Sequence, residues 1–470
     1  MSRFRPFPAL LCLFACVLLC PSSHAAQSGK PNFVVIFCDD LGWGDLSCYG
    51  HPTISTPNLD RMADEGTRMT QFYVAAPVCT PSRSALMTGR YPVRTGMCGK
   101  RRVLFPNSIG GLQASEHTVA EVLQSNGYAT GMVGKWHLGH LPEYLPTQHG
   151  FDSYYGIPYS NDMDNVAPKE MRRTVFEDPD YHHFNVPLLS GSGDDVKQIE
   201  RPVNQNTITR RYTEKATEYI RDNKDKSFFL YLAHSLPHVP LFRDKPFEGH
   251  SRAGLYGDVI EEIDWSVGQV LDTLRELNLD KETLVVFTSD NGPWLSFGDQ
   301  GGSAGPLRNG KGTTFEGGQR VPGIFWMPGT IPAGVISREL ASTLDMLPTF
   351  AAMSGTPLPE NVVLDGYDIS KTLIDGEPSP RHAMFFYRDT RLMAVRYGRY
   401  KAHFLTQDSY VPGSNVVNTH DPPLLFDLEL DISEKRDVAA AHPEVISDIQ
   451  RIVADHKANM VMAESQCDRK

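Results

Sequence analysis

Runs of apolar residues recur along the first part of the chain, and each has the length of a buried strand. The first is Phe-Val-Val-Ile-Phe at 33–37, and similar runs follow at 129–133, 228–233 and 284–288. They do not alternate apolar with polar residues, a pattern typical of strands covered on both faces in a parallel sheet. The sequence therefore predicts a central sheet that lies between two outer layers.

Segments with an apolar position every three or four residues lie between these runs and predict helices. One has Thr56 as a candidate N-cap, Pro57 at its first position and Gly66 as its stop. Others are predicted at 118–125, 208–220 and 258–277. Strands that alternate with helices favour an α/β sandwich with a largely parallel or mixed sheet.

The pattern changes between 357 and 380, a stretch rich in proline, aspartate and glycine. The elements predicted beyond it are a hairpin around Gly398, a further strand and a closing amphipathic helix, at 392–397, 399–404, 424–428 and 444–456. We therefore expect a main α/β domain over 26–356 and a smaller α+β domain over 357–470.

The first 25 residues have the pattern of a secretory signal peptide. Arg3 and Arg5 precede an apolar run at 9–19, and Ser-His-Ala at 23–25 resembles a cleavage site. The run is too short to span a bilayer and no second long apolar segment follows, so we expect no membrane span. The chain has no Asn-x-Ser/Thr sequon, which favours a secreted or periplasmic protein over a glycosylated lysosomal one.

The net charge restricts the partners of the protein. The chain carries 45 basic and 56 acidic residues, a formal charge of −11, and loss of Arg3 and Arg5 with the signal peptide would add two negative units. An acidic surface repels polyanions, so nucleic acid is not expected as a partner. An anionic substrate would have to be captured by a local cluster of cations.

Cys79 begins the segment Cys-Thr-Pro-Ser-Arg-Ser-Ala-Leu-Met-Thr-Gly-Arg at 79–90. Pro81 can start a helix, so Cys79 is expected at the N-terminal end, where free N–H groups and the helix dipole favour an anion. Five of the eight cysteines lie beyond the signal peptide, and an odd number fits one special thiol. A half-buried or disulfide-bonded cysteine beside an ordinary helix start would give the same local pattern.

Oxygen-bearing side chains follow two of the predicted strands. Asp39 and Asp40 come directly after the first run, and Asp290 and Asn291 come after the run at 284–288. Open α/β sheets place their ligand sites at the carboxyl ends of strands. Four hard oxygen ligands suit Ca²⁺, or less readily Mg²⁺, although adjacent acids in isolation are usually solvated turn residues.

Basic side chains occur in three further segments, and a fourth offers a hydroxyl. Lys135 and His137 lie in Gly-Lys-Trp-His-Leu-Gly at 134–139, and His234 and His238 lie in His-Ser-Leu-Pro-His-Val-Pro at 234–240. Of that pair, His234 is expected to be a structural histidine. Lys311 follows a glycine, but the upstream glycine spacing of a phosphate-binding P-loop is missing. Ser160, in Gly-Ile-Pro-Tyr-Ser-Asn-Asp at 156–162, is a substrate-binding candidate that could equally cap a turn.

These segments together resemble the type I, formylglycine-dependent sulfatase family, over about 31–428, and the arylsulfatase A and N-acetylgalactosamine-6-sulfatase branches are most similar. The resemblance implies an alkaline-phosphatase-like sandwich, with a large mixed sheet between helices, and a small α+β C-terminal domain. It implies a formylglycine (3-oxoalanine) made from Cys79 by a formylglycine-generating enzyme, and one Ca²⁺ held by Asp39, Asp40, residue 79, Asp290 and Asn291. The animal lysosomal members tend to have a cysteine-rich tail, where this chain has only Cys467.

The resemblance also implies the roles of the remaining residues. The catalytic set is Cys79, Arg83, Lys135, His137, His238 and Lys311, and the substrate-binding set is Ser160, Lys135, His238 and Lys311. In the family, a hydroxyl of the formylglycine hydrate attacks sulfur, His238 would protonate the leaving alcohol, and His137 would take the proton when the aldehyde reforms.

The expected activity is therefore hydrolysis of aryl or carbohydrate sulfate esters, of the arylsulfatase type. With an acidic surface, small or terminal sulfated substrates are expected over internal positions of long polyanions. Two alternatives stay open at this point: a phosphoester or phosphonate hydrolase of the same superfamily, and a sulfated-glycan binding protein without catalytic activity.

Overall fold

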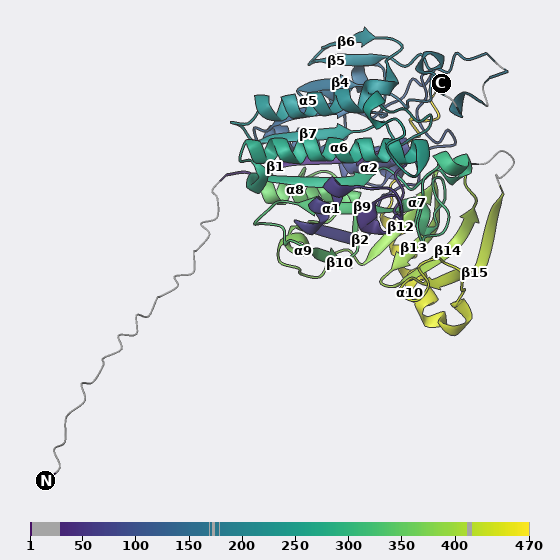
Figure 1. Cartoon of the computed structure of the whole chain (residues 1–470). Coiled ribbons are helices and arrows are strands. Elements are labelled where there is room, and N and C mark those ends of the chain that lie inside the picture. The colour runs from purple at the N-terminus through teal and green to yellow at the C-terminus, as the bar shows by residue number, and fades with distance from the viewer. Residues whose placement is uncertain (2–28, 169, 172–173, 178, 411–415, 470) are drawn as a thin grey trace.

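A large mixed sheet with helices on both faces forms the centre of the molecule, and the C-terminal part of the chain forms a smaller sheet beside it (Figure 1). The computed structural model describes Met1 and residues 29–469, apart from 169, 172–173, 178 and 411–415. The predicted signal peptide, 1–25, lies outside the described residues except for Met1. Within the described part of the chain, no helix is both long and apolar enough to cross a membrane.

Among the described residues, eleven strands form the large sheet, in the order β10-β2-β9-β8-β1-β7-β3-β4-β5-β6, with β11 beside β2. The central run from β8 to β4 is parallel, whereas β9 is antiparallel to both of its neighbours. The strands are β1 (Asn32–Cys38), β2 (Thr67–Tyr73), β3 (Ala129–Gly134), β4 (Ser153–Gly156), β5 (Leu188–Ser192), β6 (Asp195–Glu200), β7 (Phe228–Ala233), β8 (Thr283–Ser289), β9 (Arg320–Trp326), β10 (Val335–Ser337) and β11 (Ala341–Ser342).

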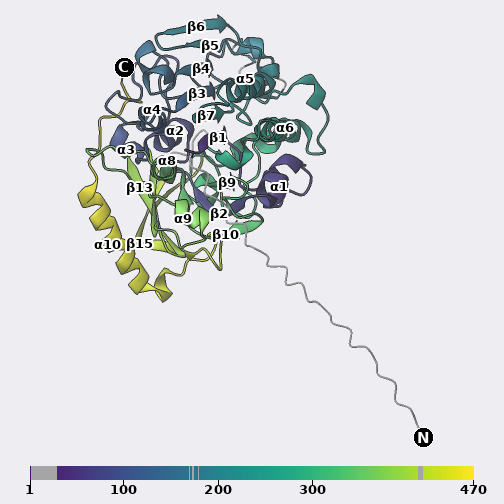
Figure 2. The ribbon, with the colours of Figure 1, turned by 90° about the vertical axis from the view of Figure 1, so that its left-hand side faces the viewer.

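Helices cover both faces of this sheet, as Figure 2 shows. One face carries α1 (Pro57–Asp64), α5 (Ile208–Asp222) and α6 (Gly254–Glu276), and the other carries α2 (Cys79–Thr88), α4 (Val119–Ser125) and α8 (Met346–Ser354). The shorter helices are α3 (Pro92–Thr95), α7 (Glu316–Gln319) and α9 (Ser370–Ile374).

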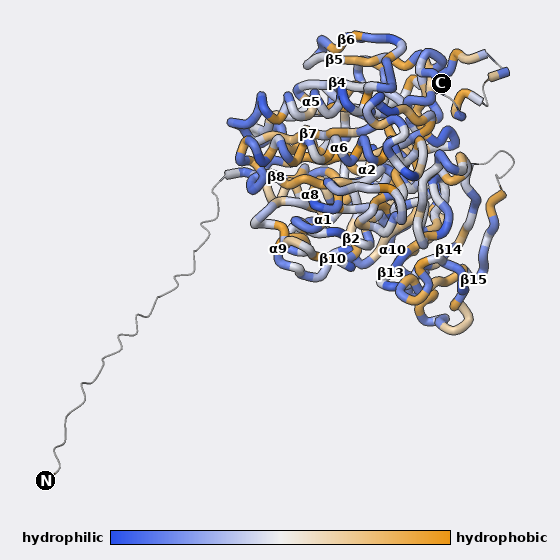
Figure 3. Tube along the Cα trace, in the orientation of Figure 1, coloured by the Kyte–Doolittle hydropathy of each residue, from blue (hydrophilic) through white to orange (hydrophobic). Residues whose placement is uncertain are grey.

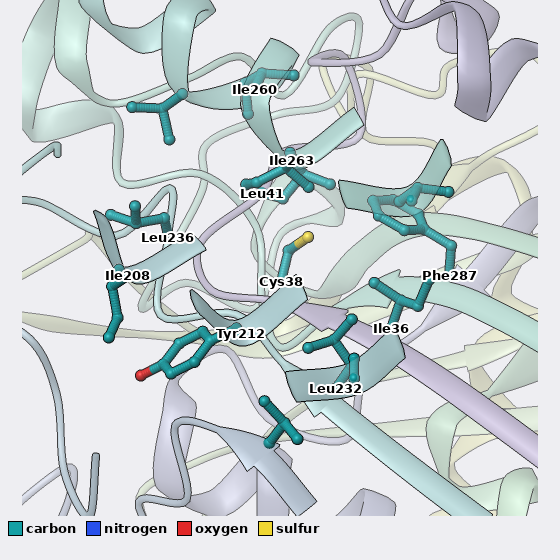
Figure 4. Close-up of a cluster of buried hydrophobic side chains, with 14 of the residues drawn as sticks. Ile36, Cys38, Leu41, Ile208, Tyr212, Leu232, Leu236, Ile260, Ile263 and Phe287 are labelled. Carbon is teal, nitrogen blue, oxygen red and sulfur yellow. The ribbon is translucent and has the colours of Figure 1, made fainter. Parts of the chain in front are cut away.

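Strand β1 is buried on both sides, as its unbroken apolar run predicted. Ile36 and Cys38 pack with Tyr212 of α5 and Ile263 of α6 in one cluster (Figure 4), and the intervening residues, such as Val35, pack in a second cluster on the opposite face. Figure 3 shows the apolar strands at the centre of the molecule between more polar outer segments. The α/β sandwich expected from the sequence is therefore confirmed.

Two local predictions differ from the structure. Thr56 precedes α1, but its side chain makes no capping hydrogen bond and instead bonds Ser47 and Asp60. Pro81 is the third residue of α2, not the first, because the helix begins at Cys79 itself. Strands β2, β4, β5, β6 and β9 were not predicted, since their shorter or more polar segments have no continuous apolar run.

The C-terminal part is a four-stranded antiparallel sheet with one long helix, α10 (Pro443–Asn459), packed against it. The predicted hairpin turns at Gly398, whose φ of 56° lies in the left-handed region that glycine adopts readily. The strands are β12 (Ala383–Arg388), β13 (Arg391–Tyr397), β14 (Tyr400–Gln407) and β15 (Val417–Asp427). Of these, β12 was not predicted.

A buried ion network joins the two sheets. Lys401 of β14 contacts the carboxylate of Glu316 in α7 at 2.8 Å and that of Glu434 at 3.3 Å, and all three side chains are fully buried. Glu434 also accepts hydrogen bonds from His403 at 2.7 Å and from the Glu316 backbone N–H at 2.6 Å. Burial alone would raise the pKa of Glu316, but Lys401, Arg320 and Arg396 outweigh it and bring the value to about 2.

We expect Lys401→Met to lower the free energy of unfolding by about 3–5 kcal/mol, because Glu434 would lose its lysine and Glu316 would lose one of its cations while both carboxylates stay buried. Lys215→Met should change it by less than about 1 kcal/mol, since its pair with Glu218 is exposed. Urea denaturation measures both variants.

The pH dependence tests the cause of this loss. Glu316 has a folded pKa below its ordinary value of 4.5, so its pairing stabilises the protein above pH 4.5 and is lost as the pH falls toward 2. The deficit of Lys401→Met should therefore shrink on acidification. A deficit that is independent of pH would show that lost packing, and not lost charge pairing, causes it.

Candidate active site

The candidate metal-ligating residues meet at the carboxyl ends of β1 and β8. These two strands are adjacent and parallel, with Cys38 paired to Ser289, so the residues that follow each strand leave the same edge of the sheet. The Asp290 N–H donates to the Cys38 carbonyl at 3.0 Å, and the Asp40 N–H donates to Asp290 Oδ1 at 3.1 Å. These acidic residues therefore lie at the strand ends, as the sequence predicted.

The side chains at this edge could hold a divalent cation. Potential ligand atoms of Asp39, Asp40, Cys79 and His238 all lie within 4.8 Å of one another, and the four residues are buried. Asn291 donates through Nδ2 to Asp40 Oδ1 at 2.7 Å, while its Oδ1 is buried without a hydrogen-bond partner. An orphaned amide oxygen beside carboxylates fits a hard cation such as Ca²⁺. His238 was not expected among the ligands, and its Nε2 lies 3.6 Å from Asp40 Oδ2.

Cys79 is the first residue of α2 and faces this cluster. Its Sγ lies 3.4 Å from Asp39 Oδ1 and 3.7 Å from Lys311 Nζ. Burial, and then the charge of Asp39, raise the pKa of the thiol well above its ordinary value, although Lys135 and Lys311 oppose the shift. Because the thiolate is the reactive form, an unmodified Cys79 would be a poor nucleophile.

Three buried cations surround the carboxylates. Arg83 contacts Asp290 at 2.9 Å and donates to the Lys135 carbonyl at 2.8 Å. Lys135 bonds Asp39 and also donates to the Ser160 hydroxyl at 3.0 Å. Lys311 lies 2.8 Å from Asp40 and 4.2 Å from the centre of the Trp294 ring.

The charges at this edge nearly cancel. Asp39, Asp40 and Asp290 face Arg83, Lys135 and Lys311, so a bound divalent cation would leave the site positive and able to attract an anion. Burial and the neighbouring Asp39 raise the pKa of Asp290 to about 7. For Asp39, Lys135 and the other nearby cations outweigh burial and hold the pKa well below its usual range.

The two histidines of the site present opposite ring nitrogens to it. His137 donates from Nε2 to the Leu104 carbonyl at 2.9 Å, which leaves Nδ1 as a buried acceptor without a partner. His238 donates from Nδ1 to the Val239 carbonyl at 2.6 Å, which leaves Nε2 directed toward Asp40. These tautomers are assigned from the hydrogen-bond partners. His234 packs beside α6, 3.3 Å from the Ser266 hydroxyl, and does not line the cavity described below.

A cavity of about 90 Å³ opens onto this edge. Its lining includes Cys79, His137, Ser160, His238 and Lys311, all expected from the sequence. The lining residues that sequence reasoning missed come from loops without a recognisable motif: Val78, Arg102, Val103, Phe105, Asp162, Met163, Trp294 and Tyr410. Asp162 is the last residue of the segment 156–162 that was singled out for Ser160, and Trp294 follows Asn291 by three positions; that proximity was the available signal.

A buried cluster of oxygen ligands, cations and histidines at the carboxyl edge of an α/β sheet, around one small cavity, defines a hydrolase of small anionic esters. Comparison of the sequence with models of protein families identifies the type of ester. The model for the sulfatase family matches residues 31–356, and a model for the C-terminal region of aryl-sulfatase matches 379–470. The chain belongs to the sulfatase family and is a sulfuric ester hydrolase.

Individual relatives agree with this assignment. Arylsulfatase A of Homo sapiens is 44% identical over 461 residues, which cover 93% of this chain and 89% of the relative. N-acetylgalactosamine-6-sulfatase of Canis lupus familiaris is 39% identical, with 95% and 90% covered. Among solved structures, the PsFucS1 sulfatase from Pseudoalteromonas sp. superposes with a TM-score of 0.85 at 29% identity, with 93% of each chain covered.

Proposed function

We propose that this protein hydrolyses sulfate esters of aryl or carbohydrate substrates with a formylglycine formed from Cys79 and one Ca²⁺. The observation that carries this proposal is the convergence of Cys79 with buried carboxylates and an orphaned Asn291 oxygen. The relatives named arylsulfatase A and N-acetylgalactosamine-6-sulfatase support both substrate types.

One set of side chains would bind the metal ion, and a second set would bind the sulfate group. Asp39, Asp40, Asp290, Asn291 and the modified residue 79 are the proposed calcium ligands. The ion would supply charge neutralisation at a sulfate oxygen, and the hydrated formylglycine would supply the attacking hydroxyl. Lys135 and Lys311 would bind the remaining sulfate oxygens, because both ammonium groups are buried beside residue 79.

Arg83 would act mainly by holding the site in place. Its guanidinium joins Asp290 to the Lys135 carbonyl, so it fixes one proposed metal ligand relative to one proposed sulfate-binding cation. Ser160, which accepts a hydrogen bond from Lys135, would position the substrate beside that lysine.

The two histidines would move protons at opposite ends of the reaction. His238 presents Nε2 to the cavity and would protonate the leaving alkoxide from that atom. Burial lowers its pKa well below the ordinary value, so the anionic substrate is needed to favour the protonated form. His137 has its free acceptor at Nδ1 and would take a proton from the hydroxyl of residue 79 when sulfate leaves.

The proposal includes the two domain boundaries and the cellular location that were expected from the sequence. Residues 26–356 would form the catalytic domain and 357–470 the smaller domain, a division supported by the two separate sheets. Residues 1–25 would direct the protein to the periplasm or the exterior and would be removed from the mature protein.

We expect active protein to contain formylglycine at position 79, because the buried thiol is a poor nucleophile. Peptide mass spectrometry should show the mass of the aldehyde in place of the thiol, and Cys79→Ala should be inactive. Full turnover by a preparation with only unmodified cysteine would contradict the proposed nucleophile.

Loss of calcium should nearly abolish turnover. Asp290→Asn removes one negative ligand, and we expect kcat/KM to fall roughly 10³-fold, since metal-based charge stabilisation contributes several kcal/mol. Calcium titration calorimetry should show weaker binding to this variant. Asp272→Asn, on the exposed surface of α6, is the matched control. Unchanged activity in protein shown by elemental analysis to be metal-free would reject the calcium site.

The acidic surface predicts an exo-acting enzyme. A chain with formal charge −11 should repel long polysulfated chains except where the buried cations meet the cavity. On a defined sulfated oligosaccharide, we expect terminal sulfate to be released first. Mass spectrometry of the products gives the order of release. Loss of sulfate from internal residues before terminal ones would refute this expectation.

A further inference from the structure

Asp162 is a carboxyl group in the cavity that the proposed sulfate chemistry does not use. It lines the same cavity as Cys79 and His238, and its Oδ1 is buried without a hydrogen-bond partner. Burial raises the pKa of Asp162, while Lys135, Lys311 and the Ser160 hydroxyl oppose the shift. A buried acceptor left without a donor is costly, so a bound substrate that supplied one would gain affinity.

The loop that carries Asp162 also contacts the backbone of the segment that carries His238. The neighbouring Asn161 donates from Nδ2 to the His238 carbonyl at 3.3 Å and to the Pro240 carbonyl at 3.1 Å. Ser160, two residues before Asp162, accepts a hydrogen bond from Lys135 at 3.0 Å. Asp162 itself lines one cavity with Ser160, His238 and Lys311, so it faces the same bound substrate as these residues.

The chemistry of Asp162 excludes the sulfate group as its partner. Sulfate oxygens and carboxylate oxygens are both acceptors, and both groups carry negative charge. The partner must be a donor on the alcohol part of the substrate. A buried carboxylate that faces a hydroxyl discriminates strongly, because a substrate without that hydroxyl leaves the carboxylate unpaired.

We propose that Asp162 accepts a hydrogen bond from a free hydroxyl close to the sulfate ester, so that the preferred substrates are sulfated sugars and not plain aryl sulfates. This inference rests on the proposed function, because it takes His238 as the leaving-group histidine. Asp162 is a specificity-determining residue in this scheme and takes no part in bond cleavage.

The test compares two substrates that differ in one hydroxyl. N-acetylgalactosamine 6-sulfate and its 4-deoxy analogue are suitable, with 4-nitrophenyl sulfate as a third substrate. Wild-type enzyme should favour the hydroxyl-bearing sugar in kcat/KM by roughly ten- to a hundredfold, the effect of a hydrogen bond to a charged group. Asp162→Ala should reduce this preference to about twofold or less, whatever its effect on overall activity.

Two further variants separate a specific contact from a structural effect. Asp162→Asn keeps a carbonyl acceptor and should retain part of the preference. Asp164→Asn changes a carboxylate of the same loop that bonds Tyr159 and Arg201 outside the cavity lining, and it should retain all of the preference.

The outcomes distinguish this proposal from the proposed function. Equal cleavage of the two sugars by wild type, or an undiminished preference in Asp162→Ala, overturns the role of Asp162. Cleavage of 4-nitrophenyl sulfate without cleavage of a panel of hydroxyl-bearing sugar sulfates overturns the substrate class and leaves the sulfatase activity intact. Failure on every sulfate ester, in protein with verified formylglycine and calcium, contradicts the proposed function itself.

Discussion

Mutual neutralisation of buried charge at the carboxyl edge of the large sheet is the constraint on which the site depends. The side chains of Asp39, Arg83 and Lys135 are all completely buried. An isolated charge in such surroundings would be strongly destabilising, so each must have its counter-charge within contact distance. The fold therefore has to fix three features together: the strand register, the start of α2 and the end of β3. A small displacement of any one of them would leave a charge unpaired.

The C-terminal part of the chain takes part in this arrangement. The Ser409 hydroxyl donates to the Lys311 carbonyl at 2.6 Å, and a Cβ at Gly312 would lie 2.5 Å from the Tyr410 ring. Glycine is needed at 312 both for that approach and for its φ of 83°. The loop of Lys311 is thus held between the two sheets, and the buried Lys401 network fixes its far end. The smaller sheet serves the active site as a support for one of its cations.

The net negative charge of the chain and the buried cations beside the cavity together limit what the protein can bind. Positive charge at the cavity is local, because each cation is paired with a carboxylate, and a metal ion would supply the excess. Under the proposed function, a single sulfate group on a small or terminal unit would therefore suit the site better than a continuous polyanion.

The sequence alone determined the type of fold and most of the chemical groups of the site. Continuous apolar runs identified β1, β3, β7 and β8, because strands buried on both faces leave no other pattern. The segments around Cys79, Lys135, His238 and Lys311 indicated the sulfatase family, and their side chains line or border one cavity. Strands such as β2, β4 and β9 were missed, since polar residues, glycine or proline interrupt their apolar positions over four to seven residues.

Only the tertiary structure decided which atoms face one another. The free Nδ1 of His137, the orphaned oxygen of Asn291 and the unpaired Oδ1 of Asp162 depend on carbonyls and amides contributed by distant loops. Lys311 and Lys401 likewise take their positions from contacts between segments far apart in the chain. Sequence patterns report local periodicity and residue type, whereas these contacts arise from packing between elements. For that reason His137, Asn291 and Lys311 could be named in advance but their orientations could not, and Asp162 and Lys401 were not named at all.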